Sequence, residues 1–216
     1  MIMGNSIKGL LIKDWKLLYN QKQTWFIVLL FYVIFCFLQN AVFAIAYCTV
    51  MFASIAVSTI AYDGQGNGTV HLFIMPITRK DYVKGKYIFA ILCTGVPWLI
   101  MNICSYIIGN IRAEDINLTE YLAVNIMVLL LAFVVVAIEI PIQLKYGAEK
   151  SRIALVLFLG MLFLVAYLLK DIVTELYNSI PSINLESAVW WCAVGILVLV
   201  LISYNISRHI VEQKEF

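Results

Sequence analysis

The sequence has few charged residues and none of the motifs on which membrane-embedded enzymes rely. Charged residues make up 13% of the 216 positions, and the two histidines, His71 and His209, lie far apart and away from any acidic cluster. A His-Glu-x-x-His motif, paired aspartates inside an apolar run and a nucleophile elbow are all missing. We therefore expect a chain that is not an enzyme.

Phosphate-binding loops and metal-binding cysteine pairs are missing as well. There is no Gly-x-x-x-x-Gly-Lys-Ser/Thr segment, so ATP hydrolysis by a phosphate loop is excluded for this chain. The five cysteines fall inside apolar stretches and form no Cys-x-x-Cys pair, a pattern typical of packing residues rather than of metal or redox sites. The sequence predicts that the chain itself binds no cofactor and no metal.

Apolar residues, in contrast, make up 63% of the sequence and gather in six long stretches. Stretches of this length and composition are typical of membrane-crossing helices. The polar segments between them are too short for a separate folded domain. We expect an all-α polytopic membrane protein, a single transmembrane domain over residues 1–216 with six transmembrane helices. The stretches cover residues 24–38, 41–61, 87–109, 121–140, 153–169 and 188–207.

Lysine and arginine are divided unequally between the two sets of loops. Thirteen of the fifteen precede the first stretch, follow the sixth, or lie between the second and third and between the fourth and fifth. Only Arg112 and Lys170 lie in the alternate loops. Because Lys and Arg are retained on the cytoplasmic side of short loops, we expect both termini to be cytoplasmic.

Residues 6–20 are predicted to form an amphipathic helix that lies in the membrane interface on the cytoplasmic side. Trp15 and Trp25 would then lie at headgroup depth. A cytosolic helix packed on a partner protein is the alternative. The apolar face would carry Ile7, Leu10, Leu11, Trp15 and Leu18, with Lys8, Lys13 and Lys16 around the rest.

Two loops on the predicted cytoplasmic side, residues 63–86 and 142–152, have more pattern than topology alone requires. Glycines at 64, 66 and 68 predict a hinge at the start of the first loop. Pro76 then opens a short helix, with Thr78 as its N-cap, which leads into the third stretch at Tyr87. Such a helix suits a groove on a cytosolic protein, with its cations near carboxylates at the rim. The alternative is a helix lying on anionic lipid headgroups.

Glu139 is the only ionisable residue well inside an apolar run, Val134-Val-Val-Ala-Ile-Glu-Ile-Pro141. A carboxylate at that depth normally faces a partner group or a water-filled cavity, which makes Glu139 a candidate intramembrane polar site. The simpler interpretation, which we favour, is an ion pair with Lys145 or with a neighbouring chain near the inner boundary.

Three segments resemble the small ABC-2-type transporter permeases. The most specific is Leu72-Phe-Ile-Met-Pro-Ile-Thr-Arg-Lys-Asp-Tyr-Val-Lys-Gly-Lys-Tyr87, preceded by an acidic residue, Asp63. The others are Pro141-Ile-x-x-Lys-Tyr-Gly147 with the basic residues after it, and the N-terminal Leu11-Ile-Lys-Asp-Trp15. The resemblance covers the whole chain in length, number of spans and polarity.

This resemblance implies a permease subunit of the type V exporter fold in the bacterial cytoplasmic membrane. Two permease subunits, identical or paralogous, would pair in the bilayer on two copies of a separate cytosolic ATPase, which binds the ATP and magnesium; no nucleic acid is involved. The resemblance implies ATPase-coupling residues and a hinge. The coupling residues are Met75, Pro76, Ile77, Thr78, Arg79, Lys80, Asp81, Tyr82, Lys84, Tyr146 and Gly147, and the hinge residues are Asp63, Gly64 and Gly85.

The substrate follows less directly from the sequence. An apolar path with few charges suits a hydrophobic or amphipathic molecule, and the resemblance to exporters of phenol-soluble modulins and bacteriocins indicates a peptide. The alternatives are an ATP-independent channel or secondary carrier, and a non-transporting membrane scaffold. A carrier would be expected to show a series of intramembrane ionisable groups or inverted repeats, and neither is evident.

Overall fold

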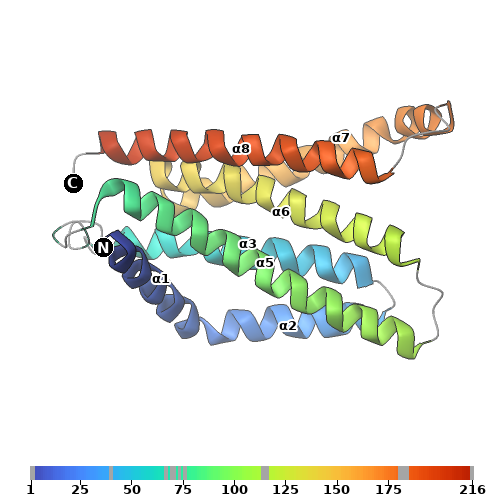
Figure 1. The fold of residues 1–216 in the computed structure, drawn as a ribbon, viewed down its shortest axis with the longest axis horizontal. Coiled ribbons are helices and arrows are strands. Elements are labelled where there is room, and N and C mark those ends of the chain that lie inside the picture. Colours follow the sequence, from blue (N-terminus) through green and yellow to red (C-terminus); the bar gives the residue numbers. More distant parts are fainter. Residues whose placement is uncertain are drawn as a thin grey trace.

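The computed structural model describes residues 3–38, 41–65, 77–112, 117–179 and 185–214, together with Gly68, Leu72 and Ile74. Within these residues the protein is all helical and forms an elongated bundle (Figure 1). The helices are α1 (Met3–Asn20), α2 (Lys22–Phe37), α3 (Ala41–Asp63), α5 (Arg79–Ile111), α6 (Leu118–Tyr146), α7 (Ala148–Ser179) and α8 (Leu185–Gln213).

Four helices in the described part of the chain are long and apolar enough to cross a membrane, over Ala41–Asp63, Arg79–Ile111, Leu118–Tyr146 and Val189–Gln213. Helix α2 is also apolar but has only 16 residues. The outside of the bundle is rich in exposed apolar side chains, as expected of a surface that faces lipid tails rather than water. On α5 these include Ile91, Leu92, Leu99, Ile103 and Ile107, and on α8 Trp190, Trp191, Val194, Leu197 and Leu201.

Helix α3 forms the centre of the bundle. It packs against α1, α2, α5, α6 and α7, while α6 also packs along α8. Small side chains such as Ala44, Ala53 and Ala56, all buried, let neighbouring backbones approach α3 closely, which is how helices associate where the hydrophobic effect is weak.

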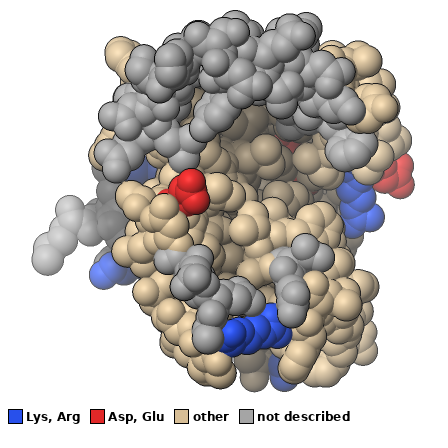
Figure 2. Space-filling model, turned by 90° about the vertical axis from the view of Figure 1, so that its right-hand side faces the viewer, with Lys and Arg blue, Asp and Glu red and all other residues tan. Residues whose placement is uncertain are grey.

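The start of α1, the ends of α3 and α8, the start of α5 and the connection between α6 and α7 lie at one end of the bundle (Figure 1). We call this the basic end, because the loops and helix ends that carry thirteen of the fifteen Lys and Arg residues meet there. Figure 2 shows the opposite end, where few of the described residues are charged and the surface is hollowed at its centre.

The short helix expected before Tyr87 is not separate from the third span. Residues from Arg79 onward belong to α5, which continues without a break to Ile111. Glycine at position 85 does not interrupt it, because Gly85 is buried against Leu10 of α1. Motion at Arg79 would therefore reach the far end of α5 through one continuous helix.

Helix α6 likewise continues past the predicted boundary at Ile140. Pro141 has no N–H, so the carbonyl of Ala137, four residues earlier, lacks its usual helical donor. The hydroxyl of Ser203, on α8, donates a hydrogen bond to this carbonyl oxygen. A side chain from a neighbouring helix thus satisfies the group that the proline leaves free, and α6 extends to Tyr146.

Candidate functional site

Helix α1 packs against the bundle with one face, which is formed by residues spaced four positions apart. Leu10, Asp14 and Leu18 are all buried, and they recur at the spacing that places side chains on one face of a helix. Leu10 contacts Gly85 of α5, whose missing side chain lets the two helices approach. An aspartate in the middle of this apolar stripe requires a partner, because a buried carboxylate without one is strongly unfavourable.

That partner is Lys86 on α5. Its ammonium group lies 2.8 and 2.9 Å from the two carboxylate oxygens of Asp14, and 2.7 Å from Asp63 Oδ2 at the end of α3. The hydroxyl oxygen of Thr59 accepts a further hydrogen bond at 3.1 Å. Lys86 is 3% exposed, so its three N–H donors are used inside the protein, by residues from α1 and α3.

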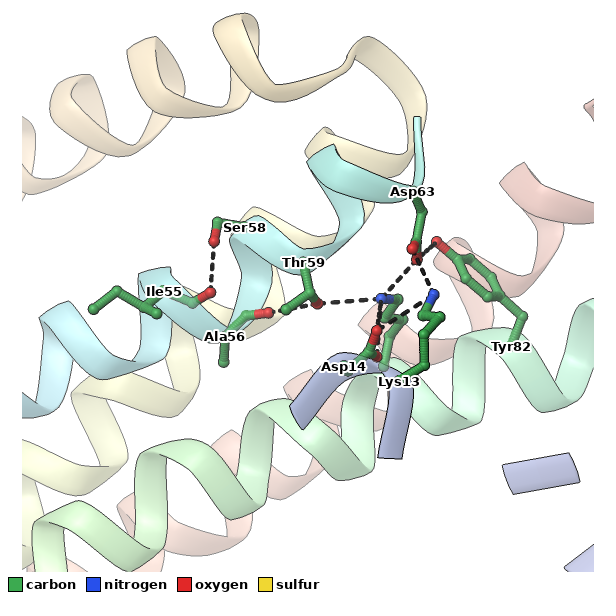
Figure 3. A network of polar contacts seen from close by, with 9 residues as sticks. Lys13, Asp14, Ile55, Ala56, Ser58, Thr59, Asp63 and Tyr82 are labelled. Carbon is green, nitrogen blue, oxygen red and sulfur yellow. Dashed lines mark hydrogen bonds and ion pairs between the residues drawn. The ribbon is translucent and has the colours of Figure 1, made fainter. Parts of the chain in front are cut away.

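Two more residues complete the cluster around Asp63. Lys13 Nζ lies 2.5 Å from Asp63 Oδ1, and the Tyr82 hydroxyl donates to Asp63 Oδ2 at 3.1 Å. Figure 3 shows Lys13, Asp14, Asp63 and Tyr82 converging from three helices. Two ammonium groups and two carboxylates give no net charge, which is the arrangement that makes buried charges tolerable. We call Lys13, Asp14, Thr59, Asp63, Tyr82 and Lys86 the charge cluster.

The next residue on α5 makes a second connection, to α8. The Tyr87 hydroxyl lies 2.6 Å from Ser203 Oγ and 2.9 Å from Ser207 Oγ. Because the single hydroxyl proton of Ser203 goes to Ala137, Tyr87 must donate to Ser203, and Ser207 must donate to Tyr87. This directed chain of hydrogen bonds joins α5, α8 and α6 at the level of Pro141.

The first turn of α5 confirms the predicted N-cap. The side chain of Thr78 accepts a hydrogen bond from the backbone N–H of Asp81 at 3.1 Å. Arg79 donates to the backbone carbonyl of Glu212, near the end of α8, whereas Lys80 and Lys84 are exposed. The exposed cations at the start of α5 are therefore Lys80 and Lys84, and Arg79 helps to hold α5 against α8.

A groove joins the two loops that the sequence singles out. It has a volume of about 450 Å³ and lies between the ends of α3, α6 and α8 and the start of α5. Gly64 and Tyr82 line it from the first loop, and Tyr146 and Gly147 from the second. Two segments far apart in sequence thus form one surface at the basic end.

Comparison with known proteins identifies the family. Residues 9–212 match the family described as ABC-2 family transporter protein. The chain belongs to the ABC-2 transporter family. This match covers nearly the whole sequence, so the protein is an integral membrane component of an ABC transporter, and the family implies association with an ABC ATPase. No curated protein and no solved structure matches the chain significantly.

The structure of this ABC-2 protein distributes the expected coupling residues unevenly. Four of them are exposed at the basic end: Lys80, Lys84, Tyr146 and Gly147. Asp81 and Tyr82 are buried instead, and the Tyr82 hydroxyl donates a hydrogen bond to Asp63. Met75 and Pro76 lie outside the described residues. Ile77 and Thr78 are at least partly exposed, immediately before α5.

The expected hinge residues of the ABC-2 protein lie in ordered surroundings. Asp63 ends α3 and belongs to the charge cluster, and the N–H of Gly64 continues the last turn of that helix by bonding to the carbonyl of Ile60. Gly85 lies inside α5. A hinge role for these residues stays a prediction.

The ion pair expected between Glu139 and Lys145 is absent from the described part of the ABC-2 protein. Lys145 is exposed beside the ring of Tyr146, while Glu139 is buried and its Oε2 has no hydrogen-bond partner among the described residues. The two residues are six positions apart on α6 and so lie on different faces of it.

Proposed function

We propose that this ABC-2 family protein is the membrane-spanning permease subunit of an ATP-driven exporter, with the basic end as the surface on which the ATPase acts. The observation that carries the proposal is the groove between Gly64, Tyr82, Tyr146 and Gly147. Both loops expected to contact an ATPase contribute to it. Exposed Lys80 and Lys84 suit carboxylates at the rim of a partner's binding groove.

In this proposal the charge cluster transmits motion. An ATPase that moves the exposed start of α5 also moves Lys86, which is bonded to Asp14 and Asp63. Helix α1 and the end of α3 must then follow or the buried ion pairs must break. Because breaking them exposes unpaired charges to an apolar environment, concerted movement of the three helices is favoured.

The proposed topology has six spans with both termini cytoplasmic. The four long apolar helices supply four crossings, and α2 and α7 supply the others. At about 1.5 Å per residue, the 16 residues of α2 cover about 24 Å, somewhat less than the apolar core of a bilayer. Helix α1 would lie in the bacterial membrane interface, and two permeases, identical or paralogous, would pair above two ATPase subunits.

An apolar cavity supports a hydrophobic or amphipathic substrate, for which we propose a peptide. The cavity, of about 800 Å³, lies between α1, α2, α3 and α5. Apolar and aromatic residues such as Trp25, Phe52 and Phe89 line it, and Lys16 is the charged residue in its lining. Its composition suits an acyl chain or an apolar peptide face and disfavours a sugar or a small ion.

The test is recovery of an ATPase with the detergent-solubilised protein from its native host. We expect the wild type to retain a nucleotide-binding subunit that the Lys80→Glu/Lys84→Glu variant loses. The matched control, Lys8→Glu/Lys16→Glu, makes the same change of charge at exposed positions of α1 and should retain it. Failure of the wild type to recover any ATPase would favour a channel, a carrier or a scaffold instead.

A further inference from the structure

Glu139 lines a cavity that is separate from the charge cluster and from the groove at the basic end. The cavity has a volume of about 530 Å³, within the range of sites for small organic ligands, and lies between the start of α2, the middle of α3, the end of α6 and the start of α7. Glu139 is 7% exposed and Ser151 is 2% exposed, and both line it. Neither Glu139 Oε2 nor Ser151 Oγ has a hydrogen-bond partner among the described residues.

The walls of this cavity are of two kinds. Ser54, Ser58 and Gln143 form a polar side near Glu139, and apolar residues such as Val28, Ile55 and Val156 form the rest. When it is ionised, the Glu139 carboxylate only accepts hydrogen bonds, and a cationic donor makes the strongest bond with it. The apolar walls call for an apolar body attached to that donor.

We propose that this cavity binds an amphipathic cation, with its ammonium group on Glu139 and its apolar part against α2 and α7. Ser151 lines the same cavity. Arg152 lines the cavity too and acts electrostatically on Glu139. Arg152 is exposed, so it competes with the ligand for the carboxylate without filling the site.

A buried water is the competing occupant. Glu139 and Ser151 also line a much smaller space of about 10 Å³ between α6 and α7, about the size that holds one water. A water there would satisfy Oε2 and leave the larger cavity without a specific ligand. Binding of a cation that depends on Glu139 distinguishes the two.

The experiment measures binding of dodecylammonium to the purified protein in lipid nanodiscs by equilibrium dialysis, with empty nanodiscs subtracted. N-dodecylacetamide, which has the same chain and no charge, is the matched probe. We expect Glu139→Gln to weaken dodecylammonium binding about tenfold or more, as for loss of one charged hydrogen bond, and to leave N-dodecylacetamide binding unchanged. Glu120→Gln, at an exposed position in the first turn of α6, should bind both probes as the wild type does.

The Arg152→Gln variant should change the affinity for dodecylammonium in the opposite direction, so it tests the site even if the Glu139 variant folds poorly. Removal of the competing guanidinium should tighten dodecylammonium binding. The proposal is overturned if the wild type retains no more dodecylammonium than empty nanodiscs, if Glu139→Gln binds it unchanged or weakens both probes equally, or if Arg152→Gln does not tighten binding.

This inference goes beyond the proposed function, because the cavity proposed for the transported substrate lies between α1, α2, α3 and α5 and does not include Glu139. The binding measurement involves no ATPase. Cation binding without recovery of an ATPase would refute the exporter and keep the site, and the reverse result would refute the site alone.

Discussion

Lys86 and Tyr87 are consecutive on α5, yet their side chains join different helices. Lys86 is bonded to Asp14 of α1 and Asp63 of α3, and Tyr87 to Ser203 and Ser207 of α8. Successive residues of a helix point about 100° apart, so one turn of α5 is held from two directions. Its first turns are thereby fixed to the bundle while Lys80 and Lys84 remain exposed.

Replacement of Lys86 by methionine should strongly destabilise the protein. The change leaves Asp14 and Asp63 with Lys13 as the cation that remains to them among the described residues, and removal of one partner from a buried ion pair costs about 3–5 kcal/mol. Thermal unfolding in detergent, followed by tryptophan fluorescence, measures the effect. Lys84→Met, at an exposed position on the same helix, is the control and should unfold near the wild-type temperature; equal stability of the two variants would show that the charge cluster does not hold α5.

Removal of the Ser203 hydroxyl should cost more than removal of the Ser207 hydroxyl. Ser203→Ala leaves the buried carbonyl of Ala137 without a donor, at about 1–3 kcal/mol, whereas Ser207→Ala removes only a bond to Tyr87, at about 0.5–1.5 kcal/mol.

The same thermal measurement on a Pro141→Ala background isolates the cause. Alanine at position 141 restores an N–H that reaches Ala137, so Ser203→Ala should then cost about as little as Ser207→Ala. An undiminished effect of Ser203→Ala on that background would mean that the hydroxyl does not compensate for the proline.

Gly147 should tolerate no side chain. It joins α6 to α7 with φ of 86° and ψ of 179°, a backbone conformation that is essentially restricted to glycine. Gly147→Ala should therefore destabilise the connection by about 1–3 kcal/mol, although a Cβ there would meet no neighbouring atom. Gly160→Ala, inside α7 and equally uncrowded, is the control and should be neutral or slightly stabilising. Matching unfolding temperatures for the two variants would contradict the argument.

Local signals in the sequence predicted local structure well. The Thr78 cap, the amphipathic helix near the N-terminus and the gathering of Lys and Arg at one end each depend on neighbouring residues or on loop order alone. Helices α5 and α6 extend beyond the apolar stretches that begin at Tyr87 and end before Pro141, and they do so for a shared reason. The apolar pattern of a sequence shows where the surroundings of a helix change from lipid to water. The helix itself continues as long as its backbone groups find hydrogen-bond partners, and Ser203 supplies such a partner for the carbonyl of Ala137.

The charge cluster is the main feature of the site that the sequence did not predict. Asp14 is four residues from both Leu10 and Leu18, so an acidic side chain on the buried face of α1 was visible in the spacing. Its partner was not, because Lys86 is 72 residues away and looks like one more cytoplasmic cation. Pairing of distant residues depends on how the helices pack, which spacing along the chain does not contain.

We propose that the start of α5 contacts the ATPase, and site-specific photocrosslinking in membranes of the native host measures this contact. A benzoylphenylalanine in place of Lys84 is compared with one in place of Ile111, which is 79% exposed at the other end of the same helix. We predict a crosslink to a nucleotide-binding subunit from position 84 and none from position 111. A crosslink from position 111, or from neither position, would show that the ATPase does not bind at the start of α5.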